Sequence, residues 1–363
     1  MSVNISTEDF AILLAFESNP FMPMTELASL LGVTRITAKK RVDDLRNRGI
    51  IRTPIAIINP YTLDLHRVSI FAHVNLTSKL HVLEKACDEH PYTHYRVRAF
   101  GGCFGLFMQF DIPPNTDYLL HEFLEKLKKE NIIDSFTTLK SSGIRTDIYA
   151  DLKKYNAKLS SWNFSWNSWF DSLSKYKTDL PIQNKKSVDY TNFTPNHFKI
   201  LRMLTADGSL KQTDIIDKLN LSKTQTHRDY NYIMDNYIDR IRFIYNREIF
   251  QLTETYIAFG TKPIRDCAAR LFNAINTDPP PFRFSLDIIE DDSILIWVNM
   301  SSTQASDFAF SIWNYYESIE VYTLNTKKSK LYWFYPENFN FNNRGWEISK
   351  DYFIFEPLER TFS

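Results

Sequence analysis

Residues 25–49 read TELASLLGVTRITAKKRVDDLRNRG, and the same pattern returns in residues 213–237 as TDIIDKLNLSKTQTHRDYNYIMDNY. Both belong to longer segments, 10–51 and 198–239, that align without a gap at one constant offset (198 − 10 = 188). Few residues are identical, but apolar positions stay apolar and polar positions stay polar. A shared pattern of this length predicts that one fold occurs twice in the chain.

Each copy has the start and stop signals of three helices. In the first copy Gly32 ends a short second helix, because glycine accepts the left-handed backbone of a tight helix stop. Thr34 then caps a third helix over residues 35–47, and Ser222 is the equivalent cap in the second copy. Two helices joined by a short turn form a helix-turn-helix, which places its second helix in the DNA major groove.

Three short motifs of the first copy point to a known family. They are Glu26-Leu27-Ala28, Gly32-Val33-Thr34 and the string RVDDLRNRGII at residues 41–51. With these motifs the chain resembles the Lrp/AsnC family of prokaryotic and archaeal transcription regulators over about its first 145 residues. The second half matches in pattern only, since Asp229 and Tyr237 replace the residues equivalent to Arg41 and Gly49.

The segment after each helix-turn-helix has the pattern of a ferredoxin-like domain. In the first half we expect strands and helices in the order strand-helix-strand-strand-helix-strand, at residues 66–74, 78–90, 93–100, 103–112, 116–130 and 132–139. The second half offers a short strand near 256–259, followed by elements at 262–276, 282–289, 293–300, 302–316 and 319–324. Residues 241–245 and 248–252 also predict a β-wing. The fold class is therefore α+β, with two tandem units, each a winged helix-turn-helix followed by a ferredoxin-like βαββαβ domain.

The expected domain boundaries follow from this order. They are 1–60 and 193–254 for the two winged helix-turn-helices, 61–145 and 255–335 for the two ferredoxin-like domains, 146–192 for an aromatic-rich connecting arm, and 336–363 for an aromatic C-terminal arm. Trp162, Trp166 and Trp169 make the connecting arm too aromatic for a flexible linker. We expect both arms to pack on their own sheet or on the other half; the alternative is a surface that stacks on bases.

Composition limits the remaining classes. The chain has zero net charge and three cysteines without the spacing of a zinc site or a disulfide framework. It has neither a signal peptide pattern nor an apolar run long enough to span a bilayer, so we expect a cytoplasmic, nucleoid-associated protein without a membrane partner. We expect no metal site and no cofactor, because six histidines fall on different elements without ligand spacing: His66, His73, His81, His90, His94 and His121.

Basic residues concentrate on the third helix of each copy, where they can neutralise DNA phosphates. The first copy supplies the candidate DNA-binding residues Thr34, Arg35, Thr37, Lys39, Lys40, Arg41 and Arg52. The second copy supplies Ser222, Lys223, Gln225, His227, Arg228 and Arg242. A solvated helix face is the alternative interpretation of such a pattern.

These observations predict a sequence-specific regulator of transcription that binds double-stranded DNA through two diverged recognition helices and is not an enzyme. A small-molecule effector is a further candidate partner. Lrp/AsnC proteins dimerise through their ferredoxin-like sheets, so a tandem chain is expected to form an internal pseudo-dimer, with further homodimerisation left open. On the first sheet we place four apolar residues on or near the face free of helices: Phe71, Phe104, Leu106 and Phe110.

Two alternatives remain. Siroheme decarboxylases share the Lrp/AsnC architecture, are built from two such units, and carry a Tyr-Arg-Arg-Glu-His run on the second sheet strand. This chain has Tyr95-Arg96-Val97-Arg98 there, without the glutamate and histidine, so the porphyrin chemistry lacks its proton donor in this reading. The other alternative is a protein-interaction module whose helix-turn-helices do not bind DNA.

Overall fold

The computed structural model describes residues 5–102, 104–181, 193–264, 266–332 and 335–363. The predicted strand start at Cys103 and residues 182–192 of the connecting arm lie outside these ranges. Within them, every helix is too short or too polar to cross a bilayer.

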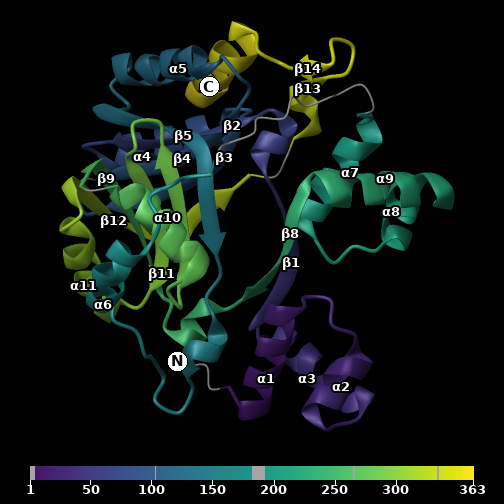
Figure 1. Ribbon diagram of the computed structural model, residues 1–363. Helices are drawn as coiled ribbons and strands as arrows, with labels where there is room; N and C mark the ends of the chain where they lie inside the picture. Colours follow the sequence, from purple (N-terminus) through teal and green to yellow (C-terminus); the bar gives the residue numbers. More distant parts are fainter. Residues whose placement is uncertain (1–4, 103, 182–192, 265, 333–334) are drawn as a thin grey trace.

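Both repeated segments fold into three-helix heads, as the sequence predicted (Figure 1). The Thr37 amide donates to the Thr34 hydroxyl at 3.2 Å, and the Gln225 amide donates to the Ser222 hydroxyl at 3.2 Å. Each third helix therefore begins at its predicted cap, and Gly32 ends the preceding helix with a φ of 65°. The helices are α1 (Thr7–Ser18), α2 (Met24–Leu31) and α3 (Arg35–Asn47) in the first head, and α7 (Pro195–Ala206), α8 (Gln212–Leu219) and α9 (Lys223–Asn236) in the second.

A two-stranded ribbon joins the heads to each other and to the rest of the protein (Figure 1). In it, β1 (Ile51–Ile58) pairs antiparallel with β8 (Ile238–Tyr245). The hairpin predicted at residues 241–245 and 248–252 is not formed, because β8 takes β1 as its partner and Arg247–Phe250 is a 3₁₀ turn. The sequence could not reveal this pairing, since the two strands lie far apart in the chain.

The two ferredoxin-like units close into one eight-stranded barrel with the strand order β10-β11-β9-β12-β3-β4-β2-β5. The units meet at two seams, where β5 pairs with β10 and β12 pairs with β3, so the halves form an internal pseudo-dimer with approximate twofold symmetry about the barrel axis. The first unit contains β2 (His66–His73), α4 (Thr77–Glu89), β3 (Thr93–Phe100), β4 (Gly105–Ile112), α5 (Asp117–Lys129) and β5 (Ser135–Ile148). The second contains β9 (Glu254–Pro263), α10 (Cys267–Thr277), β10 (Arg283–Ile289), β11 (Ile294–Met300), α11 (Ser302–Trp313) and β12 (Tyr316–Leu331).

The barrel interior holds a small aromatic core. Phe71 and Phe107 lie in it, with ring centroids 5.0 Å apart. Leu106 and Phe110 belong instead to the core beneath the helices, because successive side chains on β4 point to opposite faces. Phe104 lies at the turn before β4 and is 75% exposed. Of the four residues predicted to lie on the uncovered face, only Phe71 therefore lies inside the barrel.

The two aromatic arms cross over and pack on the opposite half. Trp166, in α6 (Trp166–Asp171) of the connecting arm, stacks on Phe282 of the second unit with ring centroids 5.5 Å apart. Phe353 of the C-terminal arm meets His90 of the first unit at 4.8 Å, just before α12 (Glu356–Phe362). Each arm also contains a short strand pair: β6 (Tyr155–Asn156) with β7 (Ser161–Trp162) in the connecting arm, and β13 (Phe339–Asn340) with β14 (Gly345–Trp346) in the C-terminal arm. Since Trp166 is only 1% exposed, its ring is not available to stack on bases.

Candidate active site

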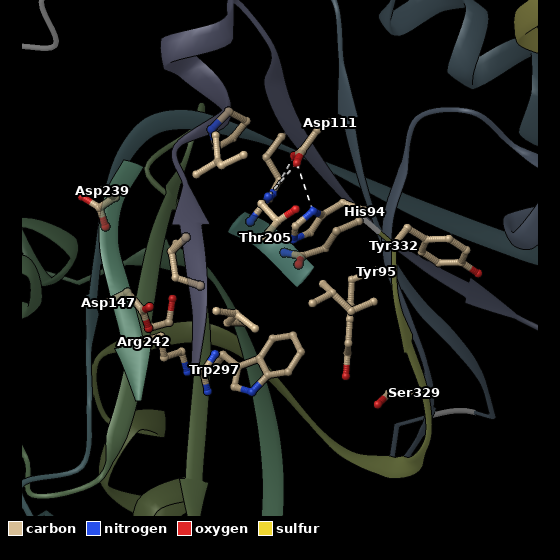
Figure 2. A pocket seen from close by; sticks show the side chains of 18 of the residues that line it. His94, Tyr95, Asp111, Asp147, Thr205, Asp239, Arg242, Trp297, Ser329 and Tyr332 are labelled. Atoms are coloured by element: carbon tan, nitrogen blue, oxygen red, sulfur yellow. Dashed lines mark hydrogen bonds and ion pairs between the residues drawn. The ribbon is translucent and has the colours of Figure 1, made fainter. Parts of the chain in front are cut away.

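A cavity of about 1010 Å³ lies at one end of the barrel, beneath the β1–β8 ribbon (Figure 2). Its wall comes from the ribbon, from strands of both ferredoxin-like units and from Thr205 at the end of α7. Ligand pockets usually occupy about 300–1,000 Å³, so this cavity has room for a large ligand. Because residues from both halves line it, the cavity exists only when the two units are closed on each other.

The lining carries more positive than negative charge. Eight cationic side chains are Arg52, Arg67, Arg145, Arg240, Arg242, Arg247, Arg283 and Lys327. Four acidic side chains are Asp111, Asp147, Asp239 and Glu248. A concave wall with an excess of arginine attracts an anion with several carboxylate or phosphate groups, because guanidinium forks bind such groups in bidentate geometry.

The ribbon supplies the most crowded of these arginines. Burial, together with the nearby Arg283 guanidinium, lowers the pKa of Arg242 to about 9 and that of Arg247 to about 10. Neither guanidinium forms an ion pair within the described residues. The Tyr149 ring packs against Arg240 and Arg242, with 4.5 and 5.3 Å from each guanidinium carbon to the ring centroid. A bound anion would relieve the repulsion between these groups.

Polar atoms without partners mark the same wall. Within the described residues, four buried atoms at the cavity make no hydrogen bond: Arg240 Nε, Arg283 Nε, Trp297 Nε1 and Asp147 Oδ1. Such atoms are rare in folded proteins, because a buried donor without an acceptor costs about 1–3 kcal/mol. Arg283 Nε and Asp147 Oδ1 lie 4.0 Å apart, and Arg240 Nε lies 3.5 Å from Asp239 Oδ2, so these ion pairs fall outside hydrogen-bond geometry and leave the three donors open to acceptor oxygens of a ligand.

Two aromatic side chains form an aromatic surface in the cavity wall. Trp297 on β11 meets Tyr95 on β3, with ring centroids 5.3 Å apart, and rests against Phe107 of the barrel core at 5.8 Å. Trp297 and Tyr95 both line the cavity (Figure 2). Aromatic rings and cationic groups in one cavity suit a flat ring system with anionic substituents.

A histidine beside this surface is held by charged partners. Asp111 accepts two hydrogen bonds from Arg67 at 2.7 Å each, and His94 Nδ1 lies 3.2 Å from Asp111 Oδ2 (Figure 2). Burial and the Arg67 charge lower the pKa of His94 to about 4, although Asp111 opposes them. Burial raises the pKa of Asp111, but Arg67 and His94 outweigh it, so its net shift is downward. The imidazole is thus oriented by a carboxylate, the arrangement that prepares histidine for acid–base chemistry.

Sequence reasoning missed His94, because it considered the six histidines only as metal ligands. It also singled out Arg96 and Arg98, which lie on the outer face of β3 and bind α4. Arg96 Nε donates to Asp88 at 2.8 Å, and Arg98 makes two 2.8 Å bonds to Glu84. Only Tyr95 of that run lines the cavity. The residue before this run, His94, also lines the cavity.

The thirteen candidate DNA-binding residues fall into two groups. Arg52 and Arg242 line the cavity. The others lie on α3 and α9 or at their caps: Thr34, Arg35, Thr37, Lys39, Lys40 and Arg41 in the first head, and Ser222, Lys223, Gln225, His227 and Arg228 in the second. Arg41 lies 3.6 Å from Glu8, and Arg228 donates to the neighbouring Asp229 at 3.1 Å. The DNA contacts expected of these residues stay a prediction, as do the sequence boundaries between domains.

Comparison with known proteins supports both the helix-turn-helix heads and the arrangement of the two units. A winged helix-turn-helix DNA-binding family model matches residues 9–52 and 193–228, in agreement with the tandem repeat. No curated protein sequence matches the chain. The structure is similar to that of the siroheme decarboxylase NirDL, with 13% identity and a TM-score of 0.54, over 90% of this chain and 94% of that chain. For NirDL in co-complex with an iron-uroporphyrin III analogue, the identity is 11% and the TM-score 0.55 over the same shares.

Transcription regulators match a smaller part. AsnC of Escherichia coli is 24% identical and covers 38% of this chain and 93% of its own, with a TM-score of 0.32. Our expectation of a DNA-binding transcription regulator that is not an enzyme is contradicted, because the solved structures that match over 90% of this chain are those of an enzyme, NirDL. The chain carries two winged helix-turn-helix segments on the two-unit fold of a siroheme decarboxylase.

Proposed function

We propose that this protein is a siroheme-decarboxylase-like enzyme that binds a carboxylate-rich tetrapyrrole in the barrel cavity and removes carboxyl groups from it. The observation that carries this proposal is the excess of arginines beside two aromatic rings, with Arg242 and Arg247 outside any ion pair of the described residues, in a cavity built by both halves of the chain. The solved complex of the similar enzyme NirDL contains an iron-uroporphyrin III analogue, which belongs to the same chemical class.

Charge supports this ligand class over an uncharged one. Arg242 and Arg247 lie on one wall with Arg283 nearby, and the carboxylate beside this group, Asp147, already receives Arg240 at 2.8 Å and lies 4.0 Å from Arg283. The acetate and propionate groups at the edge of a siroheme-type macrocycle would pair with these arginines. Each charge-assisted hydrogen bond of this kind contributes about 1.5–3 kcal/mol.

Shape supports it as well. Trp297 and Tyr95 offer aromatic faces to a flat macrocycle, and the cavity volume of about 1010 Å³ suits a ligand of that size. The ligand's peripheral carboxylates would then be free to pair with the ribbon arginines Arg240, Arg242 and Arg52.

The chemistry needs one proton for each carboxyl group that leaves. When the bond between a side-chain carbon and its carboxylate breaks, carbon dioxide leaves and the electron pair stays on the carbon, which must take up a proton. His94 is placed to supply it, since Asp111 holds Nδ1 and leaves Nε2 without a partner in the described residues. With a pKa of about 4 His94 is neutral near pH 7, and nearby ligand carboxylates would favour its protonated form.

A titration of the full-length protein with iron-uroporphyrin III, followed by visible absorbance, tests the binding step. We expect saturable binding of one macrocycle per chain that weakens as salt concentration rises. The matched control is the methyl ester of the same macrocycle, which keeps the ring and loses the charges. Equal affinity for acid and ester, or no saturable binding of the acid, would argue against the proposal.

A further inference from the structure

The two halves of the cavity differ at equivalent positions. Arg67 on β2 and Asp111 on β4 face each other in the first unit and are joined by two 2.7 Å hydrogen bonds. At the same offset that relates the heads, the second unit has Thr255 on β9 and Asn299 on β11, where the Asn299 amide donates to the Thr255 hydroxyl at 2.6 Å. A charged pair on one side is thus a neutral pair on the other.

His94 also occurs in the first unit without an equivalent in the second, because β3 has a β-bulge at this position. In the first unit Thr93 pairs with Phe110 and Tyr95 with Gln109, so His94 is an extra residue without a partner on β4. The equivalent strands β10 and β11 pair without interruption through the same region. The second unit therefore has no residue in the place of His94. Bulges of this kind commonly re-aim a side chain beside an active site.

We propose that the chain has one reactive half and one binding half, and that it decarboxylates only the substituent held against His94. This inference rests on the proposed function. The first unit donates the proton through His94, with Asp111 and Arg67 as positioning residues. The second unit contributes Trp297 and Arg283, which hold the macrocycle and its other carboxylates.

The step at His94 is balanced without an oxidant or reductant. The bond between the side-chain carbon and the carboxylate carbon breaks, carbon dioxide leaves, and the electron pair accepts the proton of His94 Nε2. Water then returns a proton to the imidazole. Because the opposite side has no equivalent acid, a second carboxyl group reacts only after the singly decarboxylated product has left the cavity and bound again in another orientation.

A single-turnover experiment with the full-length protein in excess over siroheme, kept anaerobic, tests this order. Products are separated and identified by mass spectrometry, with and without a large excess of iron-uroporphyrin III added after the siroheme has bound. We expect the added competitor to stop the reaction at the singly decarboxylated product. A doubly decarboxylated product formed despite the competitor would overturn the one-sided site, whereas the proposed function would stand.

Variants in each unit test which half of the cavity carries the reaction. His94→Gln should slow the loss of both carboxyl groups by about 10²–10⁴-fold, the usual contribution of a general acid. Thr255→Val, on the neutral side, removes the hydrogen bond from Asn299 and should change the two rates by the same factor, because both carboxyl groups react at His94. A Thr255→Val enzyme that loses only the second decarboxylation would overturn the inference. If siroheme binds to the parent protein and no carboxyl group is lost, the proposed function fails and this inference fails with it.

Discussion

The substitution Arg242→Met should change ligand affinity and protein stability in opposite directions. Arg242 lies on the cavity wall with Arg283 nearby, has no ion pair within the described residues, and has its pKa lowered to about 9. Removing it takes away one charge-assisted hydrogen bond to the ligand, worth about 1.5–3 kcal/mol, so the Kd for iron-uroporphyrin III should rise roughly tenfold to hundredfold. The same change removes an uncompensated charge from the empty protein, so the free energy of unfolding should rise by about 1–3 kcal/mol.

Absorbance titration measures the affinity, and urea unfolding followed by circular dichroism measures the stability. The matched control is Arg98→Met, which makes the same chemical change outside the cavity. Arg98 makes two 2.8 Å hydrogen bonds to Glu84, so its loss should lower the free energy of unfolding by about 1–3 kcal/mol and leave the Kd unchanged. An Arg242→Met protein that is less stable and binds as tightly as the parent would refute the reasoning, because the guanidinium would then be structural.

Three further predictions concern single residues. Burial lowers the pKa of His90 to about 3 from its usual 6.5, so the unfolded chain binds a proton that the native protein rejects between these values. The free energy of unfolding should therefore fall by up to about 1.4 kcal/mol per pH unit as the pH drops below 6.5. Urea unfolding at pH 7 and at pH 5 measures this fall, which should be smaller in His90→Phe than in the parent protein. Tyr149→Leu should weaken iron-uroporphyrin III binding about two- to tenfold, because it removes the ring beside two arginines. Tyr149→Phe keeps the ring and should bind as tightly as the parent protein. If Tyr149→Leu also binds as tightly as the parent, the ring does not position the arginines. Binding near pH 6.5 should be accompanied by proton uptake at His94, measured by calorimetry in buffers of different protonation enthalpy and absent in His94→Gln.

Local signals in the sequence were enough for the heads and for the order of strands and helices. Cap residues such as Thr34 and Ser222 act on amides three residues away, so the caps could be predicted without knowing the rest of the fold. The alternation of apolar residues likewise predicted the ferredoxin-like units. Both kinds of signal depend only on residues close in the sequence, within one or two helical turns or within one strand.

Long-range pairing was beyond such signals. The β1–β8 ribbon joins strands separated by about half of the chain, whereas the local pattern of residues 241–252 favoured a hairpin in its place. The crossed arms depend in the same way on how β5 meets β10, since that seam carries the chain over to the other half. The sequence alone therefore left open whether each aromatic arm packs on its own half or on the other half.

The site itself was misjudged for a related reason. Strand alternation predicts that His94 and Tyr95 point to opposite faces, yet the bulge between Thr93 and Tyr95 brings both to the cavity. Arg52 and Arg242 look like DNA contacts when each head is considered alone, and become cavity residues only when the ribbon covers the barrel. A site assembled from two halves cannot be recognised from either half.

The most direct test of the proposed activity is the mass spectrum of siroheme after anaerobic incubation with the purified full-length protein. The proposal predicts products that have lost carbon dioxide, formed by the parent protein and nearly absent with His94→Gln, although both proteins bind the macrocycle. Siroheme recovered intact from the parent protein, or converted equally well by His94→Gln, would contradict it.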